Sequence, residues 1–488
     1  MKIKKILDCC KTPFLVKNLK SINVKGITFN SKNIKSNFIF VAIKGMKTNG
    51  EDFINDVSNI ENVIILTSLN VSNIGNKETM FVQTKSVREL MGEISSILYP
   101  NSINDKIAIT GTNGKTSIAH YVSELSSKLS ISNAIFGTFG VLFKKKTFAE
   151  TNLTTPDIIT NHKILSELNK KKCDRVIFEA SSIGLHQKRL HNIYFDKLAF
   201  TNLTNDHLDY HKDFKNYRMS KLILFNDNIK QTSIAVINAD DKYSKFFIKI
   251  CKKNKIRILD YGKNAKHLKI IKIIKKTDTI ETHLQLNHKI FCINFPCYAS
   301  YQVYNQICAF LLVFGKKLNK KKIIDNLNMS DPNGRLEKIY DKNKIRVFID
   351  YAHTPDALKQ VLSTLSNGDG NLVIVFGCGG DRDIQKRPLM SKEAIKYCDY
   401  IFMTSDNPRT ESPNKIFSDM TKTLKKNDLK KIEIIENRSK AICAAIDFIK
   451  SGDTLIIAGK GHEKYQIIDN KRIYFSDSEI ATNKLLDK

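Results

Sequence analysis

The sequence lacks paired Cys-x-x-Cys motifs, because its 10 cysteines are scattered along the chain apart from the adjacent Cys9 and Cys10. Zinc ribbons and disulfide scaffolds depend on closely spaced cysteines, so neither is expected, and the thiols are expected to be reduced and mostly buried. The sequence also lacks any uninterrupted apolar run approaching the ~20 residues that cross a bilayer. The start of the chain is basic like a secretory signal, but Asp8 and Lys11 interrupt its apolar stretch. We therefore expect a cytoplasmic protein without stable membrane insertion.

Acidic residues are scarce relative to basic ones, since 49 Asp and Glu residues face 79 Lys and Arg residues and leave a formal net charge of +30. A nucleic-acid-binding surface usually combines clustered basic residues with interleaved aromatic ones. The lysines here are instead spread over the whole chain beside abundant Ile and Asn. We interpret the charge as a compositional bias, and no nucleic-acid partner is expected. The charge would still help to attract an anionic substrate.

The chain has no internal repeat and no long low-complexity tract, and its 488 residues exceed what one hydrophobic core usually supports. The pattern predicts an α/β protein of three domains. Residues 1–97 alternate short apolar runs with polar turns, and residues 98–330 alternate strands with helical stretches, which indicates a mostly parallel sheet. Residues 331–488 contain buried strands that end in polar or glycine-rich residues. Since ligands bind beyond the carboxyl ends of such strands, a second binding surface is expected there.

Residues 107–117, Ile-Ala-Ile-Thr-Gly-Thr-Asn-Gly-Lys-Thr-Ser, predict an apolar strand, a glycine-rich turn and the start of a helix. Backbone N–H groups in such a turn cradle phosphates, while a lysine meets the outer phosphates and a hydroxyl meets Mg²⁺. The loop is shorter than the usual P-loop pattern, whose first glycine would fall at Ile109. The predicted nucleotide-binding residues of the loop are Gly111, Thr112, Asn113, Gly114, Lys115, Thr116 and Ser117.

Two further groups are candidates for a metal site beside this loop. Glu179 ends a predicted buried strand, and His207 lies in the polar run 201–211. Because triphosphate chemistry needs a cation that bridges phosphate oxygens, a carboxylate and an imidazole near the Thr116 hydroxyl could complete the coordination of Mg²⁺.

Several long motifs together resemble the Mur ligase family over the whole chain. They are Gly111–Thr116, Glu179–Ser182 with Gln187 and Arg189, Phe200–His211, Tyr217 with Lys221, Asp350–Asp356 and Gly459–Glu463. The resemblance implies three domains, with a central P-loop domain for ATP between a domain for a UDP-sugar and a Rossmann-like domain for an amino acid. It also implies ATP-dependent formation of an amide bond through an acyl phosphate, in the cytoplasmic synthesis of peptidoglycan precursors.

The resemblance implies roles for four catalytic residues, Lys115, Glu179, His207 and Lys221. Thr116, Glu179 and His207 would hold Mg²⁺, together with Lys221 carrying a carbamate derived from CO₂. A carbamate turns the lysine into an anion that can hold metal, whereas an ordinary lysine would repel it. An unmodified Lys221 paired with an acidic residue remains the alternative.

The other ligand sites are also implied by the resemblance. ATP would further contact Asn305, Arg335, Asp350 and His353. The UDP-MurNAc-dipeptide would meet Ser31, the loop Met46-Lys47-Thr48, Thr154, Thr155, Ser181, Gln187 and Arg189. The sequence departs from the family at Asn30, where relatives carry Asp, and at Ile183, where they carry His. These departures affect details of substrate contact and remove no group that phosphoryl transfer needs.

The motif Ser405-Asp406-Asn407-Pro408-Arg409 resembles that of the family members that add meso-diaminopimelate to the D-glutamyl carboxylate of UDP-MurNAc-L-Ala-D-Glu. Its arginine would pair with the far carboxylate, which L-lysine lacks. The implied amino-acid-binding residues are Arg382, Asp406, Asn407, Pro408, Arg409, Gly459 and Glu463, with Glu463 suited to an ammonium group. Three alternatives stay open: the same ligase adding L-lysine, a folylpolyglutamate synthase, and a basic nucleic-acid-binding ATPase. A monomer is expected.

Overall fold

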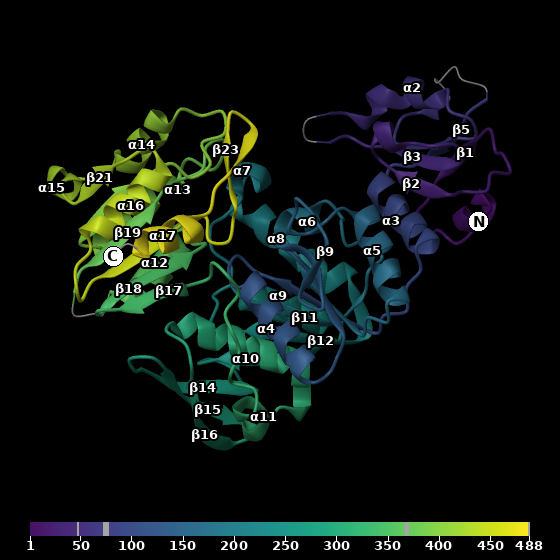
Figure 1. Cartoon of the computed structure of the whole chain (residues 1–488). Helices are drawn as coiled ribbons and strands as arrows, with labels where there is room; N and C mark the ends of the chain where they lie inside the picture. Colours follow the sequence, from purple (N-terminus) through teal and green to yellow (C-terminus); the bar gives the residue numbers. More distant parts are fainter. Residues whose placement is uncertain (46–47, 72–77, 367–369, 487–488) are drawn as a thin grey trace.

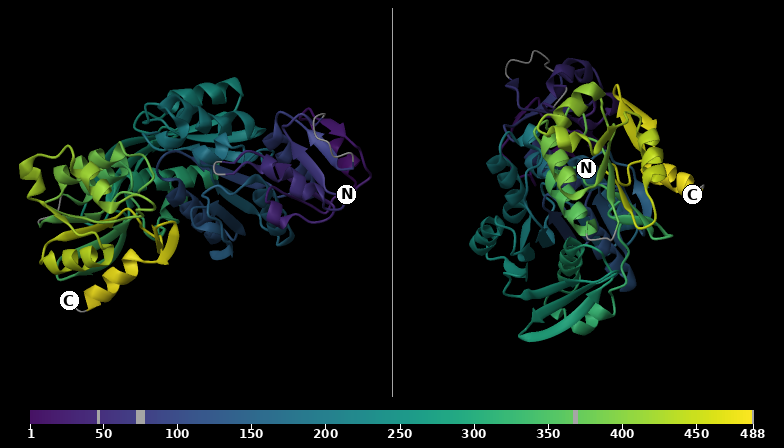
Figure 2. Two further views of the ribbon diagram at one scale, coloured as in Figure 1. Left: turned by 90° about the horizontal axis from the view of Figure 1, so that it is seen from above. Right: turned by 90° about the vertical axis from the view of Figure 1, so that its left-hand side faces the viewer.

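The computed structural model describes residues 1–45, 48–71, 78–366 and 370–486. Three separate β-sheets follow one another along the chain, and a two-stranded hairpin is added near the C-terminus. The N-terminal and C-terminal sheets lie at opposite ends of the molecule, with the largest sheet between them (Figures 1 and 2).

The N-terminal sheet has five strands in the order β1-β5-β4-β3-β2, of which only β1 runs antiparallel to its neighbour. Its strands are apolar and buried at their centres, as in β3 and β4. Its elements are α1 (Ile3–Leu7), β1 (Leu15–Lys17), β2 (Gly26–Thr28), η1 (Ser31–Asn33), β3 (Phe38–Ala42), η2 (Gly50–Phe53), α2 (Ile54–Ser58), β4 (Ile64–Thr67), β5 (Met80–Gln83) and α3 (Val87–Leu98).

The central sheet has 11 strands in the order β16-β15-β14-β13-β12-β11-β6-β10-β7-β8-β9. The strands from β14 to β7 in this order are parallel, and antiparallel strands extend both ends. The strands are β6 (Asp105–Thr110), β7 (Asn133–Gly137), β8 (Gly140–Phe143), β9 (Lys146–Ala149), β10 (Arg175–Glu179), β11 (Phe195–Phe200), β12 (Ile229–Asn238), β13 (Arg257–Gly262), β14 (Leu268–Lys275), β15 (Ile280–Leu286) and β16 (Lys289–Phe295).

Helices cover both faces of the central sheet. One core packs α4 and α10 against it, and a second core on the other face includes α5, α8 and α9. Strands buried on both faces have apolar centres, as in β10 (Arg175–Glu179), whose five residues are all buried and whose middle three are apolar. The helices are α4 (Lys115–Lys128), α5 (Ile158–Lys170), α6 (Ser182–His186), α7 (Leu208–His211), α8 (Phe214–Asp227), α9 (Ser244–Lys253), α10 (Ser300–Phe314), η4 (Gly315–Lys317) and α11 (Lys320–Ile324).

The C-terminal sheet has six strands in the order β17-β18-β22-β19-β20-β21, and all but β17 are parallel. Helices α12, α13 and α14 share one core with it, and α16 and α17 share another. The elements are β17 (Glu337–Lys342), β18 (Ile345–Asp350), α12 (Pro355–Leu365), β19 (Leu372–Phe376), α13 (Lys386–Tyr397), β20 (Tyr400–Met403), α14 (Pro413–Thr421), α15 (Lys426–Leu429), β21 (Ile432–Ile434), α16 (Arg438–Phe448), β22 (Thr454–Ala458), β23 (Tyr465–Ile468), β24 (Lys471–Tyr474) and α17 (Asp477–Leu486).

The predicted α/β class is confirmed, with a mostly parallel P-loop sheet at the centre and a doubly wound, Rossmann-like C-terminal sheet. The antiparallel extensions of the central sheet were not predicted. In the described part of the chain, no helix combines the length and the apolar character that crossing a membrane requires.

Candidate active site

The phosphate-binding loop joins strand β6 to helix α4, as the sequence predicts. Gly111 has a φ of 154° and Gly114 a φ of 89°, which L side chains rarely adopt. A Cβ atom would also approach Thr201 Oγ1 to within 1.9 Å at Gly111 and Asn305 Oδ1 to 2.7 Å at Gly114. Glycine therefore lets the loop turn tightly against these neighbours and leaves the N-terminus of α4 open to an anion.

Two lysines converge on this loop. Lys115 Nζ donates to the carbonyl oxygens of Gly111 at 2.9 Å and Thr112 at 2.8 Å, and Lys221 Nζ donates to Gly111 at 2.8 Å. The Lys221 side chain is 1% exposed. Burial and the nearby charge of Lys115 hold the pKa of Lys221 well below its usual value, although Asp206 opposes them. Lys221 therefore loses its proton more readily in this position than an exposed lysine does.

Glu179, at the end of β10, faces the first turn of α4. Its carboxylate accepts hydrogen bonds from Thr116 Oγ1 at 2.7 Å, from the backbone N–H of Thr138 at 2.9 Å and from Thr138 Oγ1 at 3.1 Å. Gly137 makes room for it, since a Cβ there would lie 2.1 Å from Glu179 Oε1. The structure brings the predicted metal-site residues Thr116 and Glu179 together, and their oxygen atoms are ligands of the kind that Mg²⁺ prefers.

His207 lies at the start of α7 with a left-handed φ of 54°. Its Nε2 atom is 3.4 Å from Asp206 Oδ2. Burial lowers the pKa of His207, and the charges of Lys221 and Lys115 act in the same direction against that of Asp206. The imidazole is therefore favoured in its neutral form, the form that coordinates a metal.

A pocket of about 200 Å³ brings the predicted nucleotide residues other than Gly111 together from the central and C-terminal parts of the chain. Its walls include loop residues 112–117, Glu179, His207, Lys221, Asn305, Arg335, Asp350 and His353. Arg335 Nη2 donates a hydrogen bond to Thr116 Oγ1 at 3.3 Å. The Arg335 guanidinium lies over the Tyr351 ring, 4.3 Å from the ring centroid. The C-terminal region thus supplies a fixed cation beside the phosphate loop.

Two titratable groups of this wall lie at the end of strand β18 and just beyond it. Asp350 accepts hydrogen bonds from the backbone N–H groups of Leu336 at 2.6 Å and Ala352 at 2.7 Å, and burial raises its pKa to about 6. His353 Nδ1 lies 2.8 Å from the Tyr351 carbonyl oxygen, and burial lowers its pKa to about 4. Asp350 therefore shapes the loop around Arg335, and His353 faces the pocket as a neutral ring.

A second cleft, of about 740 Å³, lies between the central and C-terminal sheets. The predicted amino-acid-binding residues that line it are Arg382, Asp406, Asn407, Arg409, Gly459 and Glu463, whereas Pro408 is not part of its wall. Arg409 is held by its backbone, whose N–H donates to Ile467 at 3.0 Å and whose carbonyl accepts from Asp469 at 2.8 Å. Its Nη1 atom donates to the Gly380 carbonyl oxygen at 2.7 Å. Among the described residues, only backbone carbonyl groups accept hydrogen bonds from this guanidinium, which leaves its charge available to an anion.

Glu463 does not face the cleft as a free carboxylate. Its Oε2 atom accepts from Lys460 Nζ at 3.0 Å and from Asn407 Nδ2 at 3.2 Å, and Lys460 also donates to Asn407 Oδ1 at 3.2 Å. Lys460 is fully buried. The expected match of Glu463 to a substrate ammonium is thus modified, because an ammonium of the protein already pairs with this carboxylate.

Arg387 of α13 supports the loop that carries Arg409. Arg387 is fully buried and pairs with Glu411 at 2.6 Å and with Asp419 at 2.7 Å. Glu411 also accepts from the backbone N–H of Asp381 at 3.1 Å, in the loop of Arg382. Hydrogen bonds from Arg387 strongly lower the pKa of Glu411, to about 2. One buried arginine therefore ties both arginine-bearing loops together.

The two cavities share part of their walls. Six residues line both of them: Thr138, Thr154, Asp206, His207, Tyr351 and His353. Figure 1 shows α7, which follows His207, close to β23 of the C-terminal hairpin. A phosphate on the loop and an amine in the cleft would thus meet beside His207.

Most residues assigned to the UDP-sugar substrate cluster around α6. Thr155 Oγ1 and Ser181 Oγ are 2.9 Å apart, and Arg189 donates to Gln187 Oε1 at 2.7 Å and to the Thr155 carbonyl oxygen at 2.9 Å. Thr154 lines the phosphate pocket. A further pocket combines Gln187 and Arg189 with Arg88, Lys44 and Tyr210.

Ser31 lies apart from this group, in the turn η1 of the N-terminal region, and it is not part of that pocket wall. Asn30 caps this turn, since its side chain accepts from the Lys32 N–H at 3.0 Å. Met46 and Lys47 lie outside the described residues.

Sequence reasoning missed four polar residues, of which Asp206 and Arg88 line these cavities while Lys460 and Arg387 support residues that do. Asp206 was adjacent to the predicted His207, and Lys460 stood in the motif Gly459-Lys460-Gly461-His462-Glu463, so both had a local signal. Arg88 and Arg387 had none, because each is a single arginine in an ordinary helix.

Comparisons with known proteins agree with this geometry. A family model described as Mur ligase middle domain matches residues 109–313, and another described as Mur ligase, glutamate ligase domain, matches residues 334–461. A UDP-N-acetylmuramoyl-L-alanyl-D-glutamate–2,6-diaminopimelate ligase of Rickettsia bellii (strain RML369-C) is 38% identical over 482 residues, which cover 97% of this chain and 98% of the relative.

A ligase of the same name from Aquifex aeolicus (strain VF5) is 37% identical over 465 residues, which cover 94% of this chain and 93% of the relative. A solved structure of a ligase of that name superposes with a TM-score of 0.66 at 30% sequence identity and covers 95% of both chains. Two domain models that match in order, and relatives of this identity over nearly the whole length, establish that the chain belongs to the Mur ligase family.

Proposed function

We propose that this chain adds meso-2,6-diaminopimelate to the D-glutamyl carboxylate of UDP-MurNAc-L-Ala-D-Glu, with hydrolysis of ATP to ADP and phosphate. The observation that carries the proposal is the meeting of two cavities, one beside the phosphate loop and one lined by Arg409 and Arg382. As a Mur ligase, the chain is an ATP-dependent amide-forming ligase of peptidoglycan precursor synthesis. The identity of the added amino acid follows from the arginine-lined cleft and from the names of the relatives.

The reaction would begin with transfer of the γ-phosphoryl group to the D-glutamyl carboxylate, which gives an acyl phosphate and ADP. Lys115 and Arg335 would balance the charge of the phosphates, and the N-terminus of α4 would orient them. The deprotonated amine then attacks the acyl carbon, and the tetrahedral intermediate expels phosphate. Alignment of the two substrates next to His207 would contribute most of the acceleration.

Thr116, Glu179 and His207 would hold Mg²⁺ in this scheme. Mg²⁺ would neutralise negative charge on the phosphate oxygens. The donor set fits, since two oxygen donors lie 2.7 Å apart and His207 is favoured as a neutral imidazole. The lowered pKa of Lys221 supports its modification by CO₂, because only the neutral amine can form a carbamate.

The cleft would select the amino acid by its far end. Arg409 would pair with the carboxylate that distinguishes meso-diaminopimelate from L-lysine, and Arg382 would hold the second carboxylate. Held by Asn407 and Lys460, Glu463 would shape this end rather than bind an ammonium alone. With L-lysine bound, Arg409 would be left without an anion. The affinity for L-lysine should therefore be at least several-fold lower than that for meso-diaminopimelate.

We further propose that residues 1–97 bind the UDP-sugar, residues 98–330 bind ATP and residues 331–488 bind the amino acid, and that the chain acts as a monomer. The three separate sheets support this division. The cluster of Gln187, Arg189 and Arg88 beside the N-terminal sheet supports a site for the anionic UDP-sugar at that junction.

The test is a coupled assay of phosphate release with the purified chain, ATP, Mg²⁺ and UDP-MurNAc-L-Ala-D-Glu, in which meso-diaminopimelate and L-lysine are compared and the product mass is measured. We expect a tripeptide product only with diaminopimelate. Equal activity with L-lysine would reject the assigned amino acid. Turnover with a folate substrate and glutamate, or turnover stimulated by DNA or RNA alone, would reject the proposed substrates in favour of the other two alternatives.

A further inference from the structure

The two outermost strands at one end of the central sheet, β15 and β16, present a polar face away from the core. Along β15, Ile280, Thr282 and Leu284 are buried, and the residues between them are half-buried. Because successive side chains of a strand point to opposite faces, Glu281 and His283 lie on the same outward face. This region lies at the end of the sheet, and four strands separate β15 from β6 of the phosphate loop.

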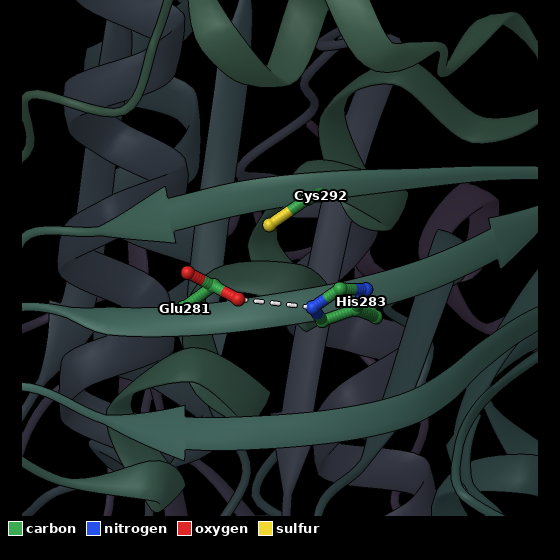
Figure 3. Close-up of side chains that lie close together, drawn as sticks. All are labelled: Glu281, His283 and Cys292. Carbon is green, nitrogen blue, oxygen red and sulfur yellow. Dashed lines mark hydrogen bonds and ion pairs between the residues drawn. The ribbon is translucent and has the colours of Figure 1, made fainter.

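Three side chains with metal-binding atoms meet on this face. His283 on β15 is paired in register with Cys292 on β16, and Glu281 precedes His283 by two residues. One ligand atom from each of the three lies within 4.8 Å of the others. Figure 3 shows the carboxylate, the imidazole and the thiol facing a common point above the two strands.

We propose that Glu281, His283 and Cys292 form a binding site for a single divalent cation of the Zn²⁺ class. A thiolate, an imidazole nitrogen and a carboxylate are the three ligand types that Zn²⁺ accepts, and three protein ligands leave a fourth position for water. Mg²⁺ prefers oxygen ligands alone and would not be favoured by this set. The site is therefore chemically different from the oxygen-rich group around Thr116 and Glu179.

The charged groups around the cluster suit a site at which a metal cation displaces a lysine ammonium. Lys276 Nζ lies 2.5 Å from Glu281 Oε2, and His283 Nε2 lies 3.0 Å from Glu281 Oε1. The Lys276 side chain is 48% exposed, so it can turn into solvent when a cation takes its place. Lys276 is thus a competitor of the cation.

A cation at this position would join the edge strand β16 to β15 through side chains as well as through the backbone ladder. Ligands that come from two strands are brought together only in the folded sheet, so the cation would bind the folded state and stabilise it by mass action. None of Glu281, His283 and Cys292 lines the pocket beside the phosphate loop or the amino-acid cleft. Metal binding here is therefore expected to leave ligase activity unchanged.

Co²⁺ is the probe for this site, because a thiolate bound to Co²⁺ gives a ligand-to-metal absorption band. The full chain would be stripped of metal under reducing conditions and titrated with Co²⁺ in excess Mg²⁺. We expect the band to reach its full height with one equivalent of Co²⁺ and to disappear when Zn²⁺ displaces the Co²⁺. Cys292→Ser should abolish the band, and His283→Ala should weaken binding by about tenfold or more, since loss of even an outer partner of a metal ligand costs 10–100-fold.

Two matched variants sharpen the result. Cys9→Ser removes another exposed thiol and should leave the titration unchanged. Lys276→Gln removes the competing ammonium and should tighten Co²⁺ binding several-fold, an effect opposite in sign to that of the ligand variants. A band that persists in Cys292→Ser, or the absence of a band in the unaltered chain, would overturn the proposal. Circular dichroism of each variant would verify that the sheet is folded.

Discussion

The Nζ atom of Lys221 lies 2.8 Å from the carbonyl oxygen of Gly111, the same oxygen that Lys115 approaches to 2.9 Å. Burial lowers the pKa of both lysines, and the charge of Lys115 lowers that of Lys221 further, as the charge of Arg335 does for Lys115. Conversion of Lys221 to a carbamate would replace the repulsion between these side chains by attraction.

Lys221→Ala is therefore expected to reduce ligase turnover by at least about 100-fold, the usual effect of losing one group that stabilises transition-state charge. Added formate or acetate should restore part of the activity, because a small carboxylate can occupy the space of the carbamate. Lys215→Ala, at an exposed position of the same helix, serves as the control. Full activity of the Lys221 variant without added carboxylate would contradict the carbamate.

Arg409→Ala should raise the KM for meso-diaminopimelate by roughly 10- to 100-fold, because a charge-assisted hydrogen bond contributes about 1.5–3 kcal/mol. The KM for ATP should not change, since Arg409 lines only the second cleft. Arg409→Lys keeps the charge but loses the planar fork, so an intermediate KM is expected. Steady-state kinetics with each substrate varied would measure the effect, and unaltered amino-acid kinetics would remove Arg409 from the site.

Arg387→Met tests how the amino-acid loops are positioned. The variant leaves Glu411 and Asp419 without their buried partner, so unfolding should become easier by about 3–5 kcal/mol. The KM for diaminopimelate should rise more than kcat falls, because the two loops of Arg382 and Arg409 lose their common support. Thermal unfolding and the split between KM and kcat would be measured together. Lower stability with unchanged KM would reduce Arg387 to a purely structural role.

The pH dependence of stability should contain a contribution from His162 of helix α5. Burial lowers its pKa from 6.5 to about 4, so the folded state binds fewer protons than the unfolded state between these values. Stability from this group is present above pH 6.5 and is lost as the pH falls toward 4, by on the order of 3 kcal/mol. Unfolding temperatures should fall less over this window in His162→Gln than in the unaltered chain. An identical decline would contradict the contribution of His162.

Local patterns allowed much of the fold and the phosphate site to be predicted. Strand β10 matches the predicted residues 175–179, since a short apolar run ending in Glu179 is characteristic of a buried parallel strand. The loop around Gly111 and Gly114 was predictable because its backbone conformation demands glycine. Such features depend on residues that are consecutive in the sequence.

Features that depend on distant partners could not be predicted in this way. Arg387 looks like an ordinary helix residue, and its partners Glu411 and Asp419 lie 24 and 32 residues away along the chain. The partnership of Glu463 with Lys460 also escaped notice, because the spacing does not reveal that Lys460 is fully buried. The antiparallel strands β15 and β16 were missed because the surrounding α/β pattern favoured continued parallel pairing.

A single hydrogen bond connects the phosphate loop to the first helix of the C-terminal sheet: Asn113 Nδ2 donates to Asp356 Oδ2 at 3.1 Å. Asn113 belongs to the loop that would enclose the nucleotide, and Asp356 lies in the first turn of α12. A nucleotide that orders this loop also biases the orientation of the sheet that carries the amino-acid cleft. By thermodynamic reciprocity, occupation of that cleft would then change the affinity for the nucleotide in the same sense, so the two substrates would communicate through a contact that lies outside the amino-acid cleft.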